Sequence, residues 1–306
     1  MSAPLGVASI LRQARTTLDE AGLRGSLLVR NLDTGDELGL EPDLELPVAS
    51  LVKVPLALVV LDRIRQGVLA ATTTIAVPPP QVAVAGTTGL ARFRHPASVA
   101  VEDLLYLSLA VSDNVASDLL FELAPPAEIT VELRRLGFTG ISVRHLIGEL
   151  ADTPAERFAP TEAHLAQSLA ITATTGGHGH PVAQLDVSRA NAGSARAFVE
   201  LLHGLWRPET VEPGVAARVR ELMGDNLLRQ RLAPDFSSDA ARWSSKTGTL
   251  LNLRHEVGVV EHADGGTYAV AALTESRVAA AVQPAAEAAM ATVARVLHDQ
   301  LRLSTW

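Results

Sequence analysis

The sequence contains no cysteine among its 306 residues, and only 4% of them are aromatic. The missing cysteine excludes disulfides, thiol nucleophiles and thiolate metal sites. The scarce aromatic residues leave little material for stacking on bases, and the formal net charge of −8 opposes binding to nucleic acid or to an anionic membrane surface. No apolar run is long enough to span a bilayer. We therefore expect no nucleic-acid partner and no membrane partner.

Lysine is nearly absent as well. The chain has 26 lysine and arginine residues, and only Lys53 and Lys246 are lysines. Arginine stays protonated, whereas lysine can lose its proton and act as a base. Two lysines in a chain that otherwise uses arginine are therefore predicted to be required for chemistry.

The chain is long enough to bury a large core, with 47% hydrophobic residues in one large domain or two lobes. The segment from Met1 to Gly22 lacks the basic, apolar and small-residue pattern of a signal peptide. We therefore expect a cytoplasmic protein. A chain from which a leader had been removed would read the same, and this alternative stays open.

Ser50 and Lys53 begin an apolar run that ends near Val68. Positions three apart lie on one face of a helix, so Lys53 is predicted to carry its amine back toward the Ser50 hydroxyl. A serine becomes a nucleophile when a neighbouring base takes its proton, and a neutral lysine can be that base. The alternative is a serine that caps a helix, followed by a solvated lysine.

Hydrophobic periodicity predicts strands near both ends of the chain and helices between them. The expected strands are 26–31, 37–40, 243–249, 256–261 and 268–273. The expected helices are 10–21, 53–67, 101–111, 115–123, 128–136, 192–205, 215–222 and 279–301. This order predicts an α/β (α+β) protein, with one antiparallel sheet assembled from the two ends and an inserted all-helical lobe. The predicted lobes are 1–49 plus 241–306 for the sheet and 50–240 for the helices.

Two stretches, 72–98 and 151–188, have no clear period and are expected to be irregular. His178 and His180 lie in the second stretch and could bind a metal. A metal site normally needs three or more ligands, so a glycine-rich loop is the favoured interpretation. We expect no metal and no cofactor.

Three motifs follow one another along the chain: Ser50-x-x-Lys53, Ser112-Asp113-Asn114 and Lys246-Thr247-Gly248. Together they resemble the three signatures of class A β-lactamases and penicillin-binding proteins. The resemblance implies a single β-lactamase/transpeptidase-like domain over residues 1–306, with catalysis through an acyl-serine intermediate.

The catalytic roles can be assigned to four side chains. Ser50 is expected to attack an acyl carbon, with Lys53 as the base. Lys246 would lower the proton affinity of Lys53 if both amines enter one cleft. The hydroxyl of Ser112 is expected to pass a proton to the leaving atom.

Further residues are expected to bind the substrate. Asn114 would hold either Lys53 or a substrate amide, while Asp113 is expected to cap the following helix. By resemblance, the backbone N–H groups of Ser50 and Thr249 form an oxyanion hole. The substrate carboxylate would meet residues of the third motif and its neighbours, namely Lys246, Thr247, Gly248 and Arg254. An ordinary surface arginine is an equal alternative for Arg254.

The sequence departs from the family in the loop that activates water. Class A β-lactamases carry Glu-x-x-Leu-Asn there, and the matching stretch has Ile147 and Ala151 in place of the glutamate and asparagine. Leu150 alone fits. The deacylating group is therefore expected to be absent, or supplied by the following segment, where the candidates are Glu156, Glu162 and Asp186.

These features predict a serine hydrolase of the β-lactamase-like family that acts on a small β-lactam or ester bearing a carboxylate. The missing glutamate favours a weak or atypical β-lactamase or esterase. A D,D-peptidase or transpeptidase, which requires export, is one alternative. A β-lactam sensor that stays acylated is the non-enzymatic alternative.

Overall fold

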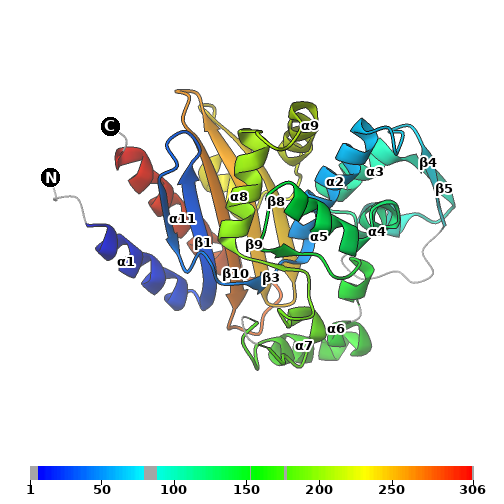
Figure 1. Ribbon diagram of the computed structural model, residues 1–306. Helices are drawn as coiled ribbons and strands as arrows, with labels where there is room; N and C mark the ends of the chain where they lie inside the picture. The colour runs from blue at the N-terminus through cyan, green and yellow to red at the C-terminus, as the bar shows by residue number, and fades with distance from the viewer. Residues whose placement is uncertain (1–5, 79–87, 152, 176–177, 305–306) are drawn as a thin grey trace.

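The computed structural model describes residues 6–78, 88–151, 153–175 and 178–304. A five-stranded antiparallel sheet carries helices on both faces, and a helical lobe extends from one side of it (Figure 1). The predicted α+β class and the β-lactamase/transpeptidase-like arrangement are confirmed.

The sheet joins the two ends of the chain. Its strands are β1 (Leu23–Asn31), β2 (Glu37–Leu40), β8 (Ala241–Leu250), β9 (Leu253–His262) and β10 (Thr267–Ser276). They follow the order β2-β1-β10-β9-β8, and Leu23 of β1 lies opposite Ser276 of β10. β8 therefore forms one edge of the sheet, with the Lys246 motif along it.

Alternation along the strands separates the two faces of the sheet. On β1, Leu27 and Val29 join the core under α1 (Val7–Glu20) and α11 (Pro284–Ser304). Leu28 faces the opposite core, against which α8 (Ala195–Trp206) packs. Successive side chains of a strand point to opposite faces, so neighbouring residues of β1 enter the two different cores. α8 thus lies on the sheet, although its residues fall within the predicted helical lobe 50–240.

The helical lobe surrounds α2 (Lys53–Arg65), whose first nine residues are all buried. A helix that is apolar on every side needs neighbours all round. They are α3 (Val101–Leu109), α4 (Asn114–Leu123), α5 (Pro126–Arg135) and α9 (Pro213–Gly224). α2 is therefore a fixed axis that carries the Ser50–Lys53 motif at its N-terminal end.

Two stretches that were expected to be irregular contain regular structure. β4 (Thr74–Val77) pairs with β5 (Ala97–Ala100), and α7 (Ala163–Ala170) lies within 151–188. In both stretches these elements contain many alanine, threonine and serine residues. The alternation between apolar and polar positions is therefore too weak to predict a helix or a strand. The remaining short elements are β3 (Leu46–Pro47), β6 (Ile141–Ser142), β7 (Ala192–Gly193), α6 (Pro154–Arg157) and α10 (Ala233–Phe236).

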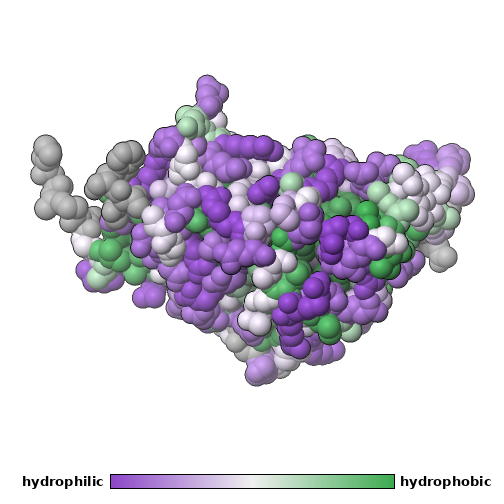
Figure 2. All heavy atoms as spheres, turned by 45° about the horizontal axis from the view of Figure 1, so that its top comes forward, coloured by the Kyte–Doolittle hydropathy of each residue, from purple (hydrophilic) through white to green (hydrophobic). Residues whose placement is uncertain are grey.

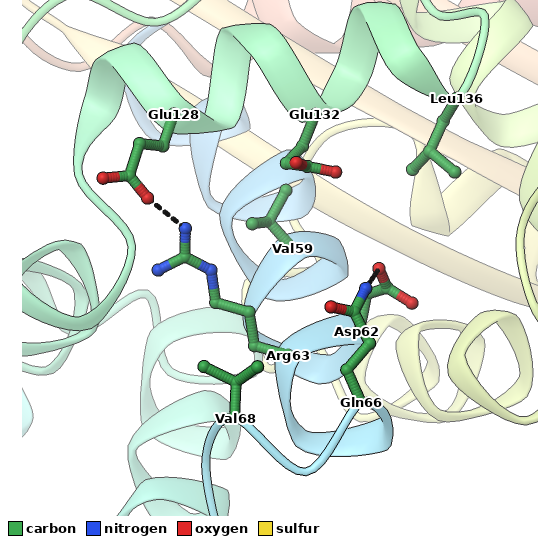
Figure 3. A pocket seen from close by; sticks show the side chains of 8 residues that line it. All are labelled: Val59, Asp62, Arg63, Gln66, Val68, Glu128, Glu132 and Leu136. Carbon is green, nitrogen blue, oxygen red and sulfur yellow. Dashed lines mark hydrogen bonds and ion pairs between the residues drawn. The ribbon is translucent and has the colours of Figure 1, made fainter.

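The surface in Figure 2 is largely hydrophilic, with separate apolar patches over the helical side. None of the helices in the described ranges has the length and apolar character needed to cross a bilayer. A cavity of about 340 Å³ opens between α2 and α5, where Arg63 pairs with Glu128 (Figure 3). It lies along the second half of α2, from Val59 onward, and Lys53 is not among the residues that line it.

Candidate active site

Ser50, the expected nucleophile, lies in a single 3₁₀ turn, Ala49–Val52, that runs directly into α2. Ala49 has φ 46°, a left-handed conformation that is uncommon for a residue with a Cβ atom. Ser50 follows it and is partly exposed, while Leu51 and Val52 are buried. The described hydrogen bonds include none from the Ser50 hydroxyl, so its pairing with Lys53 rests on the spacing of the two residues.

Strand β8 packs directly against this turn. A Cβ atom on Gly248 would lie 2.9 Å from the carbonyl oxygen of Val48 and 3.1 Å from Cγ of Leu51. Only glycine permits so close an approach between a strand and a neighbouring backbone. The glycine of the third motif therefore sets the distance between Ser50 and Thr249, whose N–H groups are the expected oxyanion hole.

A buried histidine fastens the same turn from behind. His255 on β9 lies opposite Gly248, and its Nε2 lies 2.9 Å from the carbonyl oxygen of Pro47. Its Nδ1 accepts the Thr274 N–H at 3.0 Å, so Nε2 carries the proton and donates it to Pro47. Burial lowers the pKa of His255 to about 3. The imidazole is thus a neutral, fixed strut between the sheet and the nucleophile turn.

Lys53 is buried and donates to two residues of the second motif. Its Nζ lies 2.8 Å from the Ser112 carbonyl oxygen, 3.3 Å from the Ser112 hydroxyl and 2.8 Å from Oδ1 of Asn114. Ser112 has φ 60°, and its carbonyl meets the amine in this conformation. Of the two roles open to Asn114, the structure shows contact with Lys53.

Lys246 reaches the same hydroxyl from the sheet side. Its Nζ lies 2.9 Å from Oγ of Ser112 and 2.9 Å from the carbonyl oxygen of Thr247. The only two lysines of the chain therefore meet at one serine hydroxyl. This arrangement links α2, the α3–α4 connection and β8 into one continuous hydrogen-bonded chain.

Both amines are shifted toward the neutral form. Burial lowers the pKa of Lys53 to about 7, although Asp113 and Asp118 act in the opposite direction. Burial, helped by the charges of Lys53 and Arg231, holds the pKa of Lys246 well below its usual value. A lysine that is neutral near pH 7 can accept a proton from a serine.

Asp113 caps α4, as the sequence predicts. Its Oδ1 accepts the N–H of Ala116 at 3.0 Å, and its Oδ2 accepts the N–H of Leu90 at 2.6 Å. The side chain is buried, and both of its oxygens are engaged by the backbone. Asp113 therefore fixes the position of Ser112 and Asn114 on either side of it.

The predicted substrate-binding residues separate into two groups. Thr247 and Gly248 are buried in β8 beside Lys246, and Thr249 is exposed at the end of the motif. Arg254 is buried and donates to the carbonyl oxygens of Leu251, Leu253 and Ala281. Both terminal nitrogens of its guanidinium thus donate to backbone carbonyl oxygens.

A different arginine lies behind the third motif. Arg231 donates to the carbonyl oxygen of Gly248 at 2.9 Å and to Oγ of Thr249 at 2.6 Å. Arg231 forms a salt bridge with Glu287 at 2.8 Å and interacts electrostatically with the fully buried Glu256. Nothing in the local sequence around Arg231 distinguishes it from other arginines, because its importance comes from packing against β8.

The loop that departs from the family lies beside α4. Ile147 is buried in the main core, where a class A enzyme would carry its loop glutamate. The backbone N–H groups of Ile147 and Gly148 donate to the two oxygens of Asp118, each at 2.7 Å. The carboxylate of Asp118 therefore contacts the loop. Asp118 lies outside the three motifs, and nothing in the local sequence indicates this contact.

The other carboxylates proposed from sequence have different surroundings. Asp186 accepts hydrogen bonds from Gly179 and Ser188, which lower its pKa to about 2 and give it a loop-forming role. Glu162 is exposed, and the side chain of Glu156 lies outside the described residues. His180 has its Nε2 3.1 Å from the carbonyl oxygen of Ala170. Within the described ranges, no three acidic or histidine side chains form a metal-binding group.

Comparison with known proteins agrees with this geometry. Residues 10–301 match the beta-lactamase enzyme family. The chain belongs to this family. A relative from Streptomyces cacaoi, named beta-lactamase regulatory protein BlaB, is 60% identical over 309 residues, which cover 97% of this chain and 99% of the relative.

Solved structures of the beta-lactamase fold match almost the whole chain. A beta-lactamase from Chitinophaga pinensis is 19% identical and covers 96% of this chain and 99% of its own, with a TM-score of 0.76. The structure of PBP-A is 16% identical and covers 99% and 98% of the two chains, with a TM-score of 0.75. At these identities the likeness concerns the fold, so the chain shares the beta-lactamase fold with these proteins.

Proposed function

We propose that this beta-lactamase-like protein forms an acyl ester on Ser50 from a β-lactam or an activated ester and releases the acyl group slowly. One observation supports the proposal above all. The chain Lys53–Ser112–Lys246 is complete beside Ser50, while a buried isoleucine replaces the carboxylate that would activate water.

The acylation step uses groups that are already in place. Neutral Lys53 accepts the proton of the Ser50 hydroxyl as Oγ attacks the acyl carbon, and the carbonyl bond becomes a tetrahedral oxyanion. The Ser112 hydroxyl then gives a proton to the leaving nitrogen or oxygen and regains one through the amine of Lys53 or Lys246. The bond from the acyl carbon to the leaving atom breaks, and acyl-Ser50 remains.

The substrate would carry a negative charge. Lys246 extends from β8 to the Ser112 hydroxyl, Arg231 lies behind the strand, and the hydroxyl of Thr249 accepts a hydrogen bond from Arg231 at 2.6 Å. A carboxylate at this edge would meet a hydroxyl donor supported by the buried guanidinium of Arg231. This arrangement suits a small β-lactam or ester that bears a carboxylate.

The deacylation step lacks a comparable base. Water attacks an ester slowly unless a nearby group takes its proton. Ile147 offers only hydrocarbon, and both oxygens of Asp118 accept backbone N–H groups. We therefore expect the acyl group to persist, as in a weak or atypical beta-lactamase or esterase.

Intact-mass spectrometry tests both steps. The protein is incubated with a penicillin, a cephalosporin and an activated ester, and the Ser50→Ala variant is the control. A lasting adduct that requires Ser50 supports the proposal. Turnover without a detectable adduct would show an efficient deacylating base, and neither adduct nor turnover would reject β-lactams and esters as the substrate class.

A sensor is the second candidate function. The relative that is 60% identical bears the name beta-lactamase regulatory protein. A regulator that reports β-lactams needs an adduct that outlives the exposure, whereas a weak hydrolase needs only turnover. The half-life of the adduct separates them: hours favour the sensor, and minutes with product release favour the hydrolase.

A further inference from the structure

A carboxylate on α4 lies in the same cluster as the amine of Lys53. Asp118 is one helical turn beyond Asn114, so the two side chains share one face of α4. Asn114 accepts a hydrogen bond from Nζ of Lys53 at 2.8 Å, and Asp118 accepts the N–H groups of Ile147 and Gly148 on its far side. Asp118 thus lies between the acylation base and the loop.

The approach of the loop to this carboxylate is close. A Cβ atom on Gly148 would lie 2.7 Å from Oδ2 of Asp118, so a larger residue there would require the Asp118 side chain to shift. Each oxygen of Asp118 accepts one backbone N–H, which matches an ionised carboxylate. Burial raises the pKa of Asp118, while the two N–H donors and Lys53 lower it.

The charged groups around Lys53 are few. Lys246 on β8 is a basic group whose pKa, like that of Lys53, is shifted toward the neutral form. Asp113 is the other carboxylate whose charge favours the ammonium form of Lys53, and its influence is larger than that of Asp118; it also caps α4. Glu149 lies on the loop side, where its Oε1 accepts the N–H of Leu146. Asp118 is therefore the carboxylate that α4 presents between Lys53 and the loop.

We propose that Asp118 is a positioning residue that sets the charge state of Lys53 and fastens the 147–148 turn beside it. Asp118 brings a carboxylate from the helix to the loop, where two backbone N–H groups hold it. It tunes the acylation base and leaves water unactivated. The inference rests on the proposed function for its kinetic consequence, but its electrostatic part can be measured without any substrate.

The two-lysine composition makes the direct measurement simple. Labelling with ¹³Cε-lysine gives one signal for each of Lys53 and Lys246, and the K246R variant assigns them. We expect the midpoint of the Lys53 titration to fall in Asp118→Asn, because an opposing charge that favours the ammonium form has been removed. Asp118→Glu, which keeps the charge, should move the midpoint back toward that of the wild type.

A kinetic readout follows the same charge. For each protein, the acylation rate at pH 5.5 is divided by the constant rate reached at alkaline pH. This ratio should be about threefold or more higher in Asp118→Asn than in the wild type, because more of its Lys53 is neutral at pH 5.5. A residue that merely holds the loop would lower the rate equally at every pH. Asp62→Asn is the matched control, because Asp62 lies about 13 Å along α2 from Lys53 and should leave the midpoint unchanged.

An unchanged Lys53 midpoint in a folded Asp118→Asn protein would overturn the inference. If that variant does not fold, the smaller neutral variant Asp118→Ser is measured in its place, with the same expected result. Absence of acylation with a shifted midpoint would reject the proposed function and leave this inference standing.

Discussion

Nζ of Lys246 lies 2.9 Å from Oγ of Ser112, the same atom that Nζ of Lys53 approaches at 3.3 Å. Two buried amines that share one hydroxyl can move a proton between the attacking serine and a leaving group without an additional base. Each amine also disfavours the charged form of the other, which keeps a lysine available as a base near neutral pH.

The Lys246→Arg variant should lose most acylation activity while it remains folded. Arginine keeps its proton and is too large for a fully buried position beside Ser112. We expect the acylation rate, followed by intact mass, to fall at least about tenfold, which corresponds to about 1.4 kcal/mol in the barrier. The control is Arg242→Lys, which exchanges arginine and lysine at an exposed position of the same strand and should leave acylation unchanged. Near-normal acylation by the Lys246→Arg variant would contradict the assigned role.

An acidic residue at position 147 should shorten the lifetime of the adduct. Ile147→Glu places a carboxylate where class A enzymes have their water-activating base, but Asp118 already contacts the backbone of that residue. The negative charge of Asp118 disfavours ionisation of the new carboxyl group, and only the ionised form can take a proton from water. The double variant with Asp118→Asn should therefore deacylate faster than Ile147→Glu alone, by about tenfold. Equal adduct half-lives in both folded variants and the wild type would show that the loop does not limit deacylation.

Gly248→Ala should separate β8 from the nucleophile turn. The added Cβ would meet the Val48 carbonyl oxygen at 2.9 Å, and a backbone atom cannot rotate away. We expect a loss of about 1–3 kcal/mol in the free energy of unfolding and a larger relative loss of acylation, because the oxyanion hole is displaced. The comparison is Gly214→Ala in α9, where the nearest atoms belong to the end of the Glu212 side chain. Equal acylation by both variants would argue against a positional role for Gly248.

His255 should make the protein less stable as the pH falls. Its folded pKa is about 3 against 6.5 for an ordinary histidine, so the folded state favours the neutral ring. The stability it contributes is complete above pH 6.5 and is lost progressively toward pH 3, with about 2 kcal/mol lost between pH 7 and pH 5. Urea unfolding of the wild type and of His255→Gln at both pH values measures this loss. The variant should be less stable at pH 7, and the difference should shrink at pH 5; a constant difference would mean that the ring does not titrate on unfolding.

The sequence could predict the core of the site because its chemistry lies in short motifs. Ser50, Lys53, Ser112 and Lys246 stand out by spacing and by the scarcity of lysine, and the structure brings the last three together. The sheet was predictable from two-residue alternation at both ends of the chain. These signals are local, so they do not depend on knowing which segments meet.

The supporting residues were not predictable in the same way. Asp118, Arg231 and His255 are ordinary residues within a helix, a connection and a strand, and they matter through contacts with segments 17 to 208 positions away in the chain. Arg254 illustrates the converse case. Its position near the third motif suggested a substrate ligand, but in the structure the backbone carbonyls around it take its hydrogen bonds.

The contact between β8 and the turn before Ser50 also has a consequence for synthesis. The nucleophile is made early, but the strand that completes its surroundings lies almost 200 residues later, beyond the entire helical lobe. A nascent or truncated chain that lacks β8 has a serine and a lysine without Lys246, Gly248 or the second oxyanion donor. Under the proposed function, reactivity toward an acyl donor would require both ends of the polypeptide to have met, and acylation of Ser50 would label finished molecules in preference to partly made ones.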